Sequence, residues 1–232
     1  MITTEKDIEK TIGQIVTDDF RAAEIFKQAG IDFCCGGDKT LEQACNEKNT
    51  DPALVRDQIR DITRTPIGNN YNYNEWELGF LADYIVNTHH NFVKKSLPDL
   101  VFYSKKIESV HGDHHPELIE IAALVEQINA ELLQHLHNEE EVLFPAIKAM
   151  AKTHQAETKE TILSEITRMK GEHEFAGGAM DKINVLTNNY KVPEDGCNSY
   201  NVTLQLLSRF EDDLHIHVHL ENNILYPKAL VL

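Results

Sequence analysis

The sequence has no long hydrophobic run and is short of positive charge. Its 232 residues include 22 Lys and Arg against 38 Asp and Glu, so the formal net charge is −16. No apolar segment approaches the roughly 20 residues of a membrane-spanning helix, and the charged N-terminus MITTEKDIEKTIGQIV lacks the hydrophobic segment of a signal peptide. We therefore expect a cytoplasmic protein that binds neither nucleic acid nor membranes, because both would repel this charge.

Cysteine is also scarce, with four residues in the chain. Cys34 and Cys35 are neighbours, and adjacent Cα atoms lie about 3.8 Å apart, which is below the usual span of a disulfide. This spacing argues against a disulfide framework and predicts free thiols in a reducing compartment. Cys45 and Cys197 are expected to be structural.

No stretch shows the sustained alternation of polar and apolar residues that marks a strand, so the sequence predicts an all-α protein. Residues 1–63 are expected to form a small helical domain. Three helix starts are marked by capping residues: Thr17 or Asp18, Thr40 with Gln43 in a capping box, and Asp51 before Pro52. Gly30 ends the first helix, and the loop GIDFCCGGD follows it.

Residues 64–74, RTPIGNNYNYN, are rich in Pro, Gly and Asn and predict a linker. Residues 75–232 contain four long amphipathic segments, at about 75–110, 116–150, 157–188 and 199–226. Three prolines interrupt them: Pro98 kinks or splits the first, Pro145 disturbs the second, and Pro227 ends the fourth. Four such helices indicate a four-helix bundle, whose core is a common place for a metal site.

The second of these helices has a histidine and a glutamate on its apolar face. A helix turns by about 100° per residue, so Glu139 falls about 40° from His135. The same stripe is expected to contain Ile121, Val125, Ile128, Leu132, Val142 and Leu143. His137, Glu140 and Glu141 fall on the opposite, solvated face.

The fourth helix repeats this pattern, with His217 and Glu221 on one stripe. Its apolar members are Leu207, Phe210, Leu214, Leu220, Ile224 and Leu225. His215 and His219 point to the other side. Glu131 and Asp213 each precede an inward histidine by four residues, so they are expected to accept the other imidazole N–H.

The remaining two helices each contribute a histidine. His173 lies in line with Ile162, Ile166, Met169, Ala176 and Met180. On the first helix, His90 and His89 fit apolar stripes almost equally well, and the helical pattern does not choose between them. A buried ionised glutamate needs a counter-charge, and no Lys or Arg shares the stripes of the second and fourth helices. The pattern therefore predicts a metal centre.

A ligand set of four imidazoles and two carboxylates exceeds what one structural zinc ion needs. Two carboxylates would bridge a pair of ions about 3.5–4 Å apart. We expect two non-haem iron ions with an oxo or hydroxo bridge and a position for a small ligand. Manganese or zinc could occupy the same site, since affinity alone does not select iron.

These motifs resemble those of the iron–sulfur cluster repair di-iron proteins, whose second domain is a hemerythrin-like (HHE cation-binding) bundle. DFCCGGDKTLEQA is similar to the N-terminal motif of that family, and HLHNEEEVLFP, GEHEFAGG and HVHLENNILYP are similar to its ligand motifs. The resemblance covers nearly the whole chain. It implies that Glu139 and Glu221 bridge the ions and that His90, not His89, is a ligand. The implied ligand set is His90, His135, Glu139, His173, His217 and Glu221.

The resemblance also implies a function: repair of iron–sulfur clusters after oxidative and nitrosative damage, by donation of iron or removal of nitric oxide. The implied partners are damaged iron–sulfur proteins, the small ligands nitric oxide, peroxide or oxygen, and a second copy of the chain in a homodimer. An alternative is an enzyme that reduces nitric oxide or peroxide at the same ions. Oxygen binding or sensing is less favoured, because Gly177 replaces the additional histidine that true hemerythrins have four residues after His173.

Two further motifs leave alternatives open. Cys34 and Cys35, beside two glycines, bind iron transiently, relay electrons or attack a damaged centre, or else are only small residues in a tight turn. A helix N-terminus that faced Cys34 would stabilise its thiolate. The small residues of AGGAM, residues 176–180, favour close packing of helices over a channel to the ions.

Overall fold

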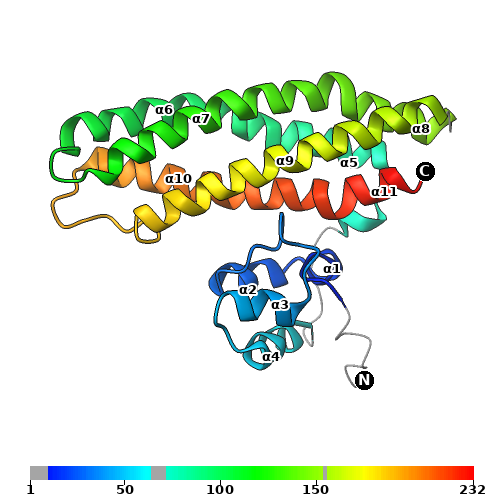
Figure 1. Ribbon diagram of the computed structural model, residues 1–232, viewed down its shortest axis with the longest axis horizontal. Helices are drawn as coiled ribbons and strands as arrows, with labels where there is room; N and C mark the ends of the chain where they lie inside the picture. Colours follow the sequence, from blue (N-terminus) through cyan, green and yellow to red (C-terminus); the bar gives the residue numbers. More distant parts are fainter. Residues whose placement is uncertain (1–9, 64–71, 154–155) are drawn as a thin grey trace.

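The computed structural model describes residues 10–63, 72–153 and 156–232. These ranges are helical and contain no strand, apart from one isolated bridge between Thr11 and Thr40. The prediction of an all-α fold is confirmed. Figure 1 shows long helical rods lying side by side, with a small group of short helices packed beneath them.

The small group contains four helices: α1 (Ile12–Asp18), α2 (Ala22–Gln28), α3 (Leu41–Glu47) and α4 (Pro52–Thr63). Two of the predicted helix starts are confirmed. The side chain of Thr40 accepts from the N–H of Gln43 in a reciprocal capping box, and Asp51 Oδ1 accepts from the N–H of Ala53 at 2.8 Å. Capping at these two positions was predictable because each depends on residues only two or three apart.

The predicted start at Thr17 or Asp18 is wrong, because the helix that ends at Gly30 is α2, whose N-cap is Arg21. Thr17 and Asp18 belong to the preceding helix α1, which Thr11 begins in a capping box with Gln14; the Thr17 hydroxyl donates to the carbonyl of Gly13 inside it. Helix α1 ends at Asp18, and the carboxylate of the next residue, Asp19, accepts a hydrogen bond from the N–H of Arg21. The predicted end of α2 is confirmed, since Gly30 has the positive φ of +66° that a helix stop requires.

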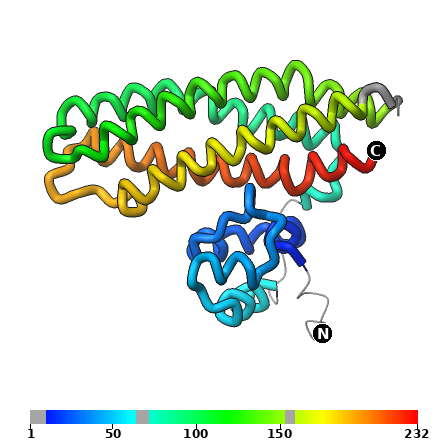
Figure 2. Tube along the Cα trace, in the orientation of Figure 1, coloured from blue at the N-terminus to red at the C-terminus, as the bar shows by residue number. Residues whose placement is uncertain are grey.

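The described residues of 78–153 and 156–230 form the four rods, three of which contain a short turn of π-helix. The first is α5 (Leu78–Ile85), η3 (Val86–His90) and α6 (Asn91–His111); the second is α7 (Glu117–Asn138), η4 (Glu139–Leu143) and α8 (Phe144–Thr153); the third is α9 (Ala156–Leu186); the fourth is α10 (Asn198–Leu220), η5 (Glu221–Leu225) and α11 (Tyr226–Leu230). A 3₁₀ turn, η2 (Tyr73–Glu75), precedes them. Figure 2 shows that successive rods run in opposite directions, which is the predicted four-helix bundle.

Proline affects the rods differently from the prediction. Pro98 lies on the exposed side within α6, which continues to His111 without a split. Pro227 does not end the fourth helix, because α11 continues to Leu230. Pro145 and Pro227 each follow a π-turn by two residues, and each lacks the N–H that a regular helix needs. The widened turn before each proline accommodates this missing bond.

The π-turns also shift the helical register. The N–H of Phe144 donates to the carbonyl of Glu139 five residues back, and that of Tyr226 donates to Glu221 in the same way. One extra residue in a turn rotates the later side chains of the rod by about 100°. Val142, predicted to be in the core, is therefore 41% exposed.

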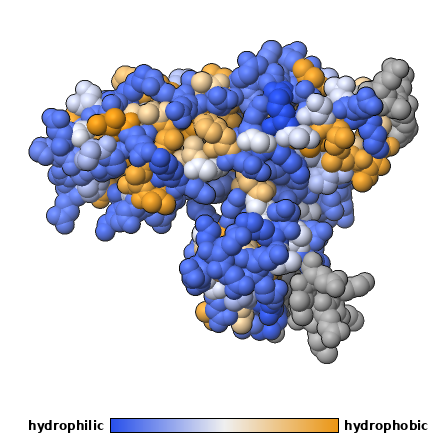
Figure 3. Space-filling view, viewed as in Figure 1, coloured by the Kyte–Doolittle hydropathy of each residue, from blue (hydrophilic) through white to orange (hydrophobic). Residues whose placement is uncertain are grey.

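The small group of helices packs against the bundle with apolar contacts. The ring of Phe33 lies 5.7 Å from that of His219 and 6.0 Å from that of His215, both on α10. Most of the predicted linker, residues 64–71, lies outside the described residues, and the boundaries at 63 and 75 stay predictions. Figure 3 shows a surface that is mostly hydrophilic on the side in view. Among the described helices, none has both the length and the apolar composition needed to span a membrane.

Candidate metal centre

The structure brings all six predicted ligands together in the middle of the bundle. Each is at most 1% exposed. The π-turns position three of them, because His90 ends η3 while Glu139 and Glu221 begin η4 and η5. His135 and His217 lie four residues before these glutamates, and His173 projects from α9. Local widening of three rods thus coincides with the candidate site, as is common for π-turns.

The six side chains form two groups that share both glutamates. One group joins His90 and His217 to Glu139 and Glu221, and the other joins His135 and His173 to the same pair; within each group the ligand atoms lie within 4.8 Å of one another. Glu139 Oε2 lies 3.3 Å from His90 Nε2 and 3.2 Å from His135 Nε2. Each group can hold one cation, with the two carboxylates between them.

Glu221 makes the corresponding contacts on the other side of the centre. Its Oε1 lies 3.0 Å from His217 Nε2, and its Oε2 lies 3.1 Å from His173 Nε2. Each glutamate therefore reaches one histidine of each group. Glu221 makes these contacts with both of its oxygens, whereas Glu139 makes both of its contacts with Oε2.

The outer nitrogens of three histidines donate to oxygen atoms. His90 Nδ1 lies 2.7 Å from Glu140 Oε1, His135 Nδ1 lies 2.7 Å from Glu172 Oε2, and His173 Nδ1 lies 3.0 Å from Asn222 Oδ1. These bonds place a proton on each Nδ1 and turn the lone pair of each Nε2 inward. Three imidazoles are thereby held in the form that binds a metal.

The acceptors of these bonds are not the predicted ones. Glu131 is exposed, and Asp213 accepts from His89 Nδ1 at 3.0 Å instead of from His217. Glu140, predicted to be on the solvated face, accepts from both His90 and Lys94. The observed acceptors all lie on a different rod from their histidines, where a helical wheel cannot place them.

The donor atoms fit a cation. His135 Nε2 and His173 Nε2 face each other at 3.1 Å, so two lone pairs would meet if both rings were neutral. His90 Nε2 and the Oε2 atoms of Glu139 and Glu221 are buried without a hydrogen-bond partner. No Lys or Arg is among the buried residues in the described part of the chain. A bound cation would satisfy all these atoms at once.

Without a cation, the histidines themselves must balance the carboxylates. Burial lowers the pKa of His90 and of His135, but the neighbouring glutamates raise each pKa further, to about 10. Burial and Glu221 raise the pKa of Glu139, yet His135 and His90 outweigh them and lower it to about 2. The carboxylates therefore stay ionised, and His90 and His135 hold protons until a metal replaces them.

Tyr226 is a neighbour of the site that the sequence analysis missed. Its hydroxyl donates to Glu139 Oε1, and its ring stacks on that of His173 at 6.1 Å and an interplanar angle of 2°. The residue stands just before Pro227 in HVHLENNILYP. Because Tyr226 is fully buried and turned inward beyond a π-turn, only the structure shows its place.

In the described part of the chain, the other histidines lie outside the two groups. His89 is buried beside the site, where its ring stacks on that of His217 with centroids 5.7 Å apart. His137 is exposed, as predicted. His219 points away from the centre, as predicted, but it is buried beneath Phe33 of the small helical group.

The loop with Cys34 and Cys35, here called the di-cysteine loop (residues 31–37), reaches the bundle from below (Figure 1). Both thiols are free. The Asp32 carboxylate accepts from the N–H groups of Cys34, Cys35 and Gly36 at 2.9–3.0 Å. A hydrogen bond with Cys35, burial and the charge of Asp32 raise the pKa of Cys34. These surroundings favour the thiol form of Cys34, and the effect of a helix N-terminus on its thiolate stays a prediction.

The small residues of α9 accommodate the di-cysteine loop. A Cβ atom on Gly177 would lie 3.5 Å from Cys35 Sγ, and one on Gly178 would meet nothing within 4 Å. The close packing expected there thus involves the loop at Gly177, while Ala176, Ala179 and Met180 are buried in the core of the bundle. Cys45 is buried in the small helical group, whereas Cys197 is exposed, with Sγ 3.1 Å from His111 Nε2.

Comparison with known proteins agrees with this architecture. Residues 8–63 match the domain of unknown function DUF542, the ScdA N-terminal domain, and residues 81–229 match the hemerythrin HHE cation binding domain. A probable iron–sulfur cluster repair protein of Haemophilus influenzae is 37% identical over 90% of this chain and 91% of its own. Iron–sulfur cluster repair protein ScdA of Staphylococcus epidermidis is 31% identical over 97% and 99%.

Iron–sulfur cluster repair protein YtfE of Yersinia pseudotuberculosis is 34% identical over 90% of this chain and 91% of its own. These relatives and the two domain matches cover nearly the whole sequence, and the matched cation-binding domain contains all six candidate ligands. The chain therefore belongs to the family of iron–sulfur cluster repair proteins with a hemerythrin HHE cation binding domain.

Proposed function

We propose that this protein repairs iron–sulfur clusters damaged by oxidative and nitrosative stress, by donating iron or removing nitric oxide at a labile non-haem di-iron centre. The observation that carries the proposal is the sharing of Glu139 and Glu221 between two pairs of histidines. The relatives named for iron–sulfur cluster repair support the same function. The proposal implies damaged iron–sulfur proteins as partners in the cytoplasm.

The six buried side chains would hold the two ions, one against His90 and His217 and the other against His135 and His173. Bound iron would supply redox chemistry and a position for a small ligand such as nitric oxide, peroxide or oxygen. Manganese and zinc remain substitutes in this proposal, because imidazole and carboxylate ligands suit them too.

The chain's own residues prepare the site in three ways. Glu140, Glu172 and Asn222 hold protons on the outer nitrogens of three histidines. Tyr226 donates to the Oε1 of Glu139 and leaves its Oε2 facing the histidines. Hydrophobic residues close the bundle on both sides and exclude water, which strengthens each charge interaction inside.

The donation step is tested by loading the protein with iron under anaerobic conditions and mixing it with an apo iron–sulfur protein. We expect the target's cluster absorption to appear as the di-iron protein loses metal, when sulfide and a thiol reductant are present. Protein with the Glu221→Ala substitution should transfer little iron. His137→Ala, which changes an exposed residue outside the ligand set, should transfer as much iron as the native protein. Transfer no faster than from free ferrous salt would contradict donation.

The removal of nitric oxide is tested separately, by adding it in increments to the same anaerobic protein. Consumption that stops at stoichiometric amounts supports repair by capture. Continued consumption with a reductant would instead indicate a nitric oxide reductase.

The homodimer belongs to the same proposal. Sedimentation of the reduced protein tests it, since a monomer at all concentrations would rule out the homodimer.

A further inference from the structure

The four histidines of the metal centre differ in the surroundings of the outer ring nitrogen, Nδ1. Three of them have an acceptor for this nitrogen, in Glu140, Glu172 or Asn222. The Nδ1 atom of the fourth, His217, is buried and has no hydrogen-bond partner among the described residues. The group of ligands that contains His217 therefore has one such acceptor, whereas the opposite group has two.

The packing beside His217 explains why its acceptor is missing. Asp213 precedes His217 by four residues on α10, but its carboxylate accepts from Nδ1 of His89, at 3.0 Å. The ring of His89 stacks on that of His217, with centroids 5.7 Å apart and an interplanar angle of 11°. His89 is itself buried. The carboxylate expected to serve His217 thus serves the residue that covers the His217 ring.

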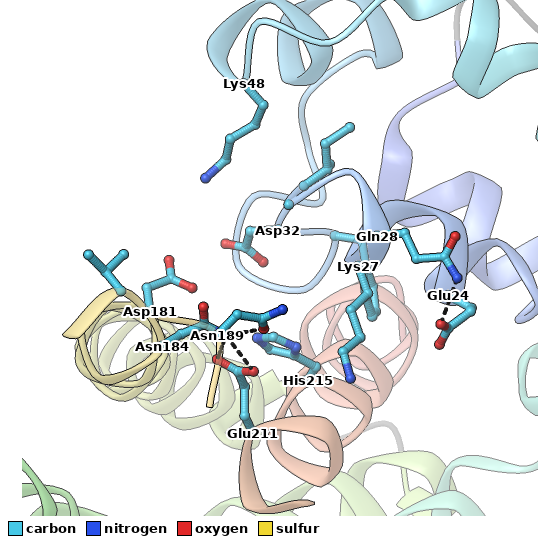
Figure 4. A pocket seen from close by; sticks show the side chains of 14 residues that line it. Glu24, Lys27, Gln28, Asp32, Lys48, Asp181, Asn184, Asn189, Glu211 and His215 are labelled. Carbon is cyan, nitrogen blue, oxygen red and sulfur yellow. Dashed lines mark hydrogen bonds between the residues drawn. The ribbon is translucent and has the colours of Figure 1, made fainter. Parts of the chain in front are cut away.

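The cavity between the small helical group and the bundle lies on another side of α10. Its volume is about 470 Å³, and Glu211 and His215 of α10 stand in its wall (Figure 4). His217 is not among the described residues that line this cavity. Two residues of helix turn a side chain by about 200°, so His215 and His217 project to opposite sides of α10. Solvent in the cavity therefore does not replace the acceptor that His217 lacks.

A missing acceptor at Nδ1 matters because a metal ion takes the lone pair of Nε2. A neutral imidazole that binds a metal through Nε2 carries its proton on Nδ1. The Nε2 atom of His217 lies 3.0 Å from Oε1 of Glu221, and an ionised carboxylate only accepts, so the metal-free ring holds its proton on Nε2. Metal binding transfers this proton to Nδ1, where it is buried without an acceptor. Loss of such an outer partner weakens metal binding about 10–100-fold.

Competition by protons does not separate the two groups of ligands. Each group contains one histidine, His90 or His135, whose pKa burial lowers and the neighbouring glutamates raise further, to about 10. Both groups also share the same two carboxylates. The number of outer acceptors is therefore the feature that distinguishes the affinities of the two groups.

We propose that the centre holds its two metal ions unequally, and that the ion held by His90 and His217 binds more weakly and leaves first. The ion held by His135 and His173 is retained. The two dissociation constants should differ about 10–100-fold. This inference rests on the proposed function, because it identifies the ion that repair by donation would deliver.

The order of release is tested on the full native chain, loaded anaerobically with two ferrous ions per chain. A chelator removes iron until one ion per chain is left, and the protein is then crystallised. Anomalous scattering at the iron absorption edge locates the remaining iron. We expect the stronger peak between His135 and His173. Equal peaks, or a stronger peak between His90 and His217, would overturn the proposal.

The variant Glu172→Ala tests whether the outer acceptors cause the unequal binding. It removes the acceptor of His135, so that each group retains one acceptor, and the two peaks should become nearly equal. The control Glu131→Ala, an exposed change on the same helix as His135, should keep the native difference between the peaks. A difference as large in Glu172→Ala as in the native protein would overturn the role of the outer acceptors.

The crystals contain no acceptor protein, so the order of release is measured independently of iron transfer. Unequal peaks without transfer to an apo iron–sulfur protein would support this order and contradict donation. Equal peaks with transfer would overturn this order and leave donation in place.

Discussion

The side-chain amide of Asn223 donates to the carbonyl oxygen of Cys34, 3.2 Å away, and to that of Phe33, 3.3 Å away. The preceding residue, Asn222, accepts from Nδ1 of the candidate ligand His173. Both asparagines belong to η5, the π-turn that begins with Glu221. One turn of helix therefore contacts the di-cysteine loop on its outer side and the metal centre on its inner side.

Replacement of Asn223 should loosen the di-cysteine loop. Asn223→Ala leaves two carbonyl groups of the loop without their donor, which costs about 1–3 kcal/mol if they stay buried. We expect amide exchange of residues 33–37 to accelerate and the free energy of unfolding to fall by that amount. Asn201→Ala, on the exposed surface of α10, is the control. Equal exchange of the loop in both variants would show that Asn223 does not hold it.

Gly37 is expected to be intolerant of any side chain. A Cβ atom there would lie 2.5 Å from Asn223 Oδ1 and 2.7 Å from the carbonyl oxygen of Phe33. Gly37→Ala should therefore lower the free energy of unfolding by about 1–3 kcal/mol, as overpacking does elsewhere. Gly178→Ala, in open space on α9, should be neutral or stabilise the helix by up to about 1 kcal/mol. Chemical denaturation measures both, and a Gly178→Ala loss as large as that of Gly37→Ala would contradict the packing described.

The hydrogen bond between Glu172 and His135 should tune metal affinity. Glu172→Ala removes the acceptor of the His135 Nδ1 proton, and loss of such a partner weakens metal binding about 10–100-fold. Glu131→Ala, on the same helix as His135 but exposed, should have no effect. Competition with a chelator measures both affinities. A larger loss of metal affinity in Glu131→Ala than in Glu172→Ala would support Glu131 as the partner of His135 and would contradict Glu172.

Cys197 should be the most reactive thiol at neutral pH. A hydrogen bond with His111, together with backbone bonds, lowers the pKa of Cys197 to about 7. Thiolate is the reactive form and accumulates as pH rises through the pKa, so alkylation by iodoacetamide should reach half its plateau rate near pH 7. His111→Ala should move that midpoint up towards about 8.5, the value of a free cysteine. Mass spectrometry of the Cys197 peptide measures the rate, and an unchanged midpoint in the variant would contradict the role of His111.

The parts of the site that depend on one regular helix were predictable from the sequence. His135 with Glu139, and His217 with Glu221, lie one turn apart, so their common direction follows from helix geometry. The need for a bound cation was also predictable, because the apolar stripes of the second and fourth helices each contain a glutamate but no Lys or Arg. His90 was separated from His89 only by resemblance to a family, and the structure places His90 in the centre.

The parts that depend on contacts between helices were not predictable. Glu172 and Asn222 approach their histidines from other rods, and no spacing within one helix reveals them. The π-turns add a residue that shifts the register of each rod, which moved Val142 to the surface. His219 lies on the outer face, as the wheel predicts, but the small helical group covers that face.

The most direct test of the central claim is the iron content per chain after anaerobic purification, compared between the native protein and two variants. Glu221→Ala removes a carboxylate shared by both groups, so it should lose about two iron ions per chain relative to the native protein. His137→Ala, which alters an exposed neighbour of the motif, should lose none. Iron content that is the same in Glu221→Ala as in the native protein, or that falls equally in both variants, would contradict a metal pair held by these six side chains.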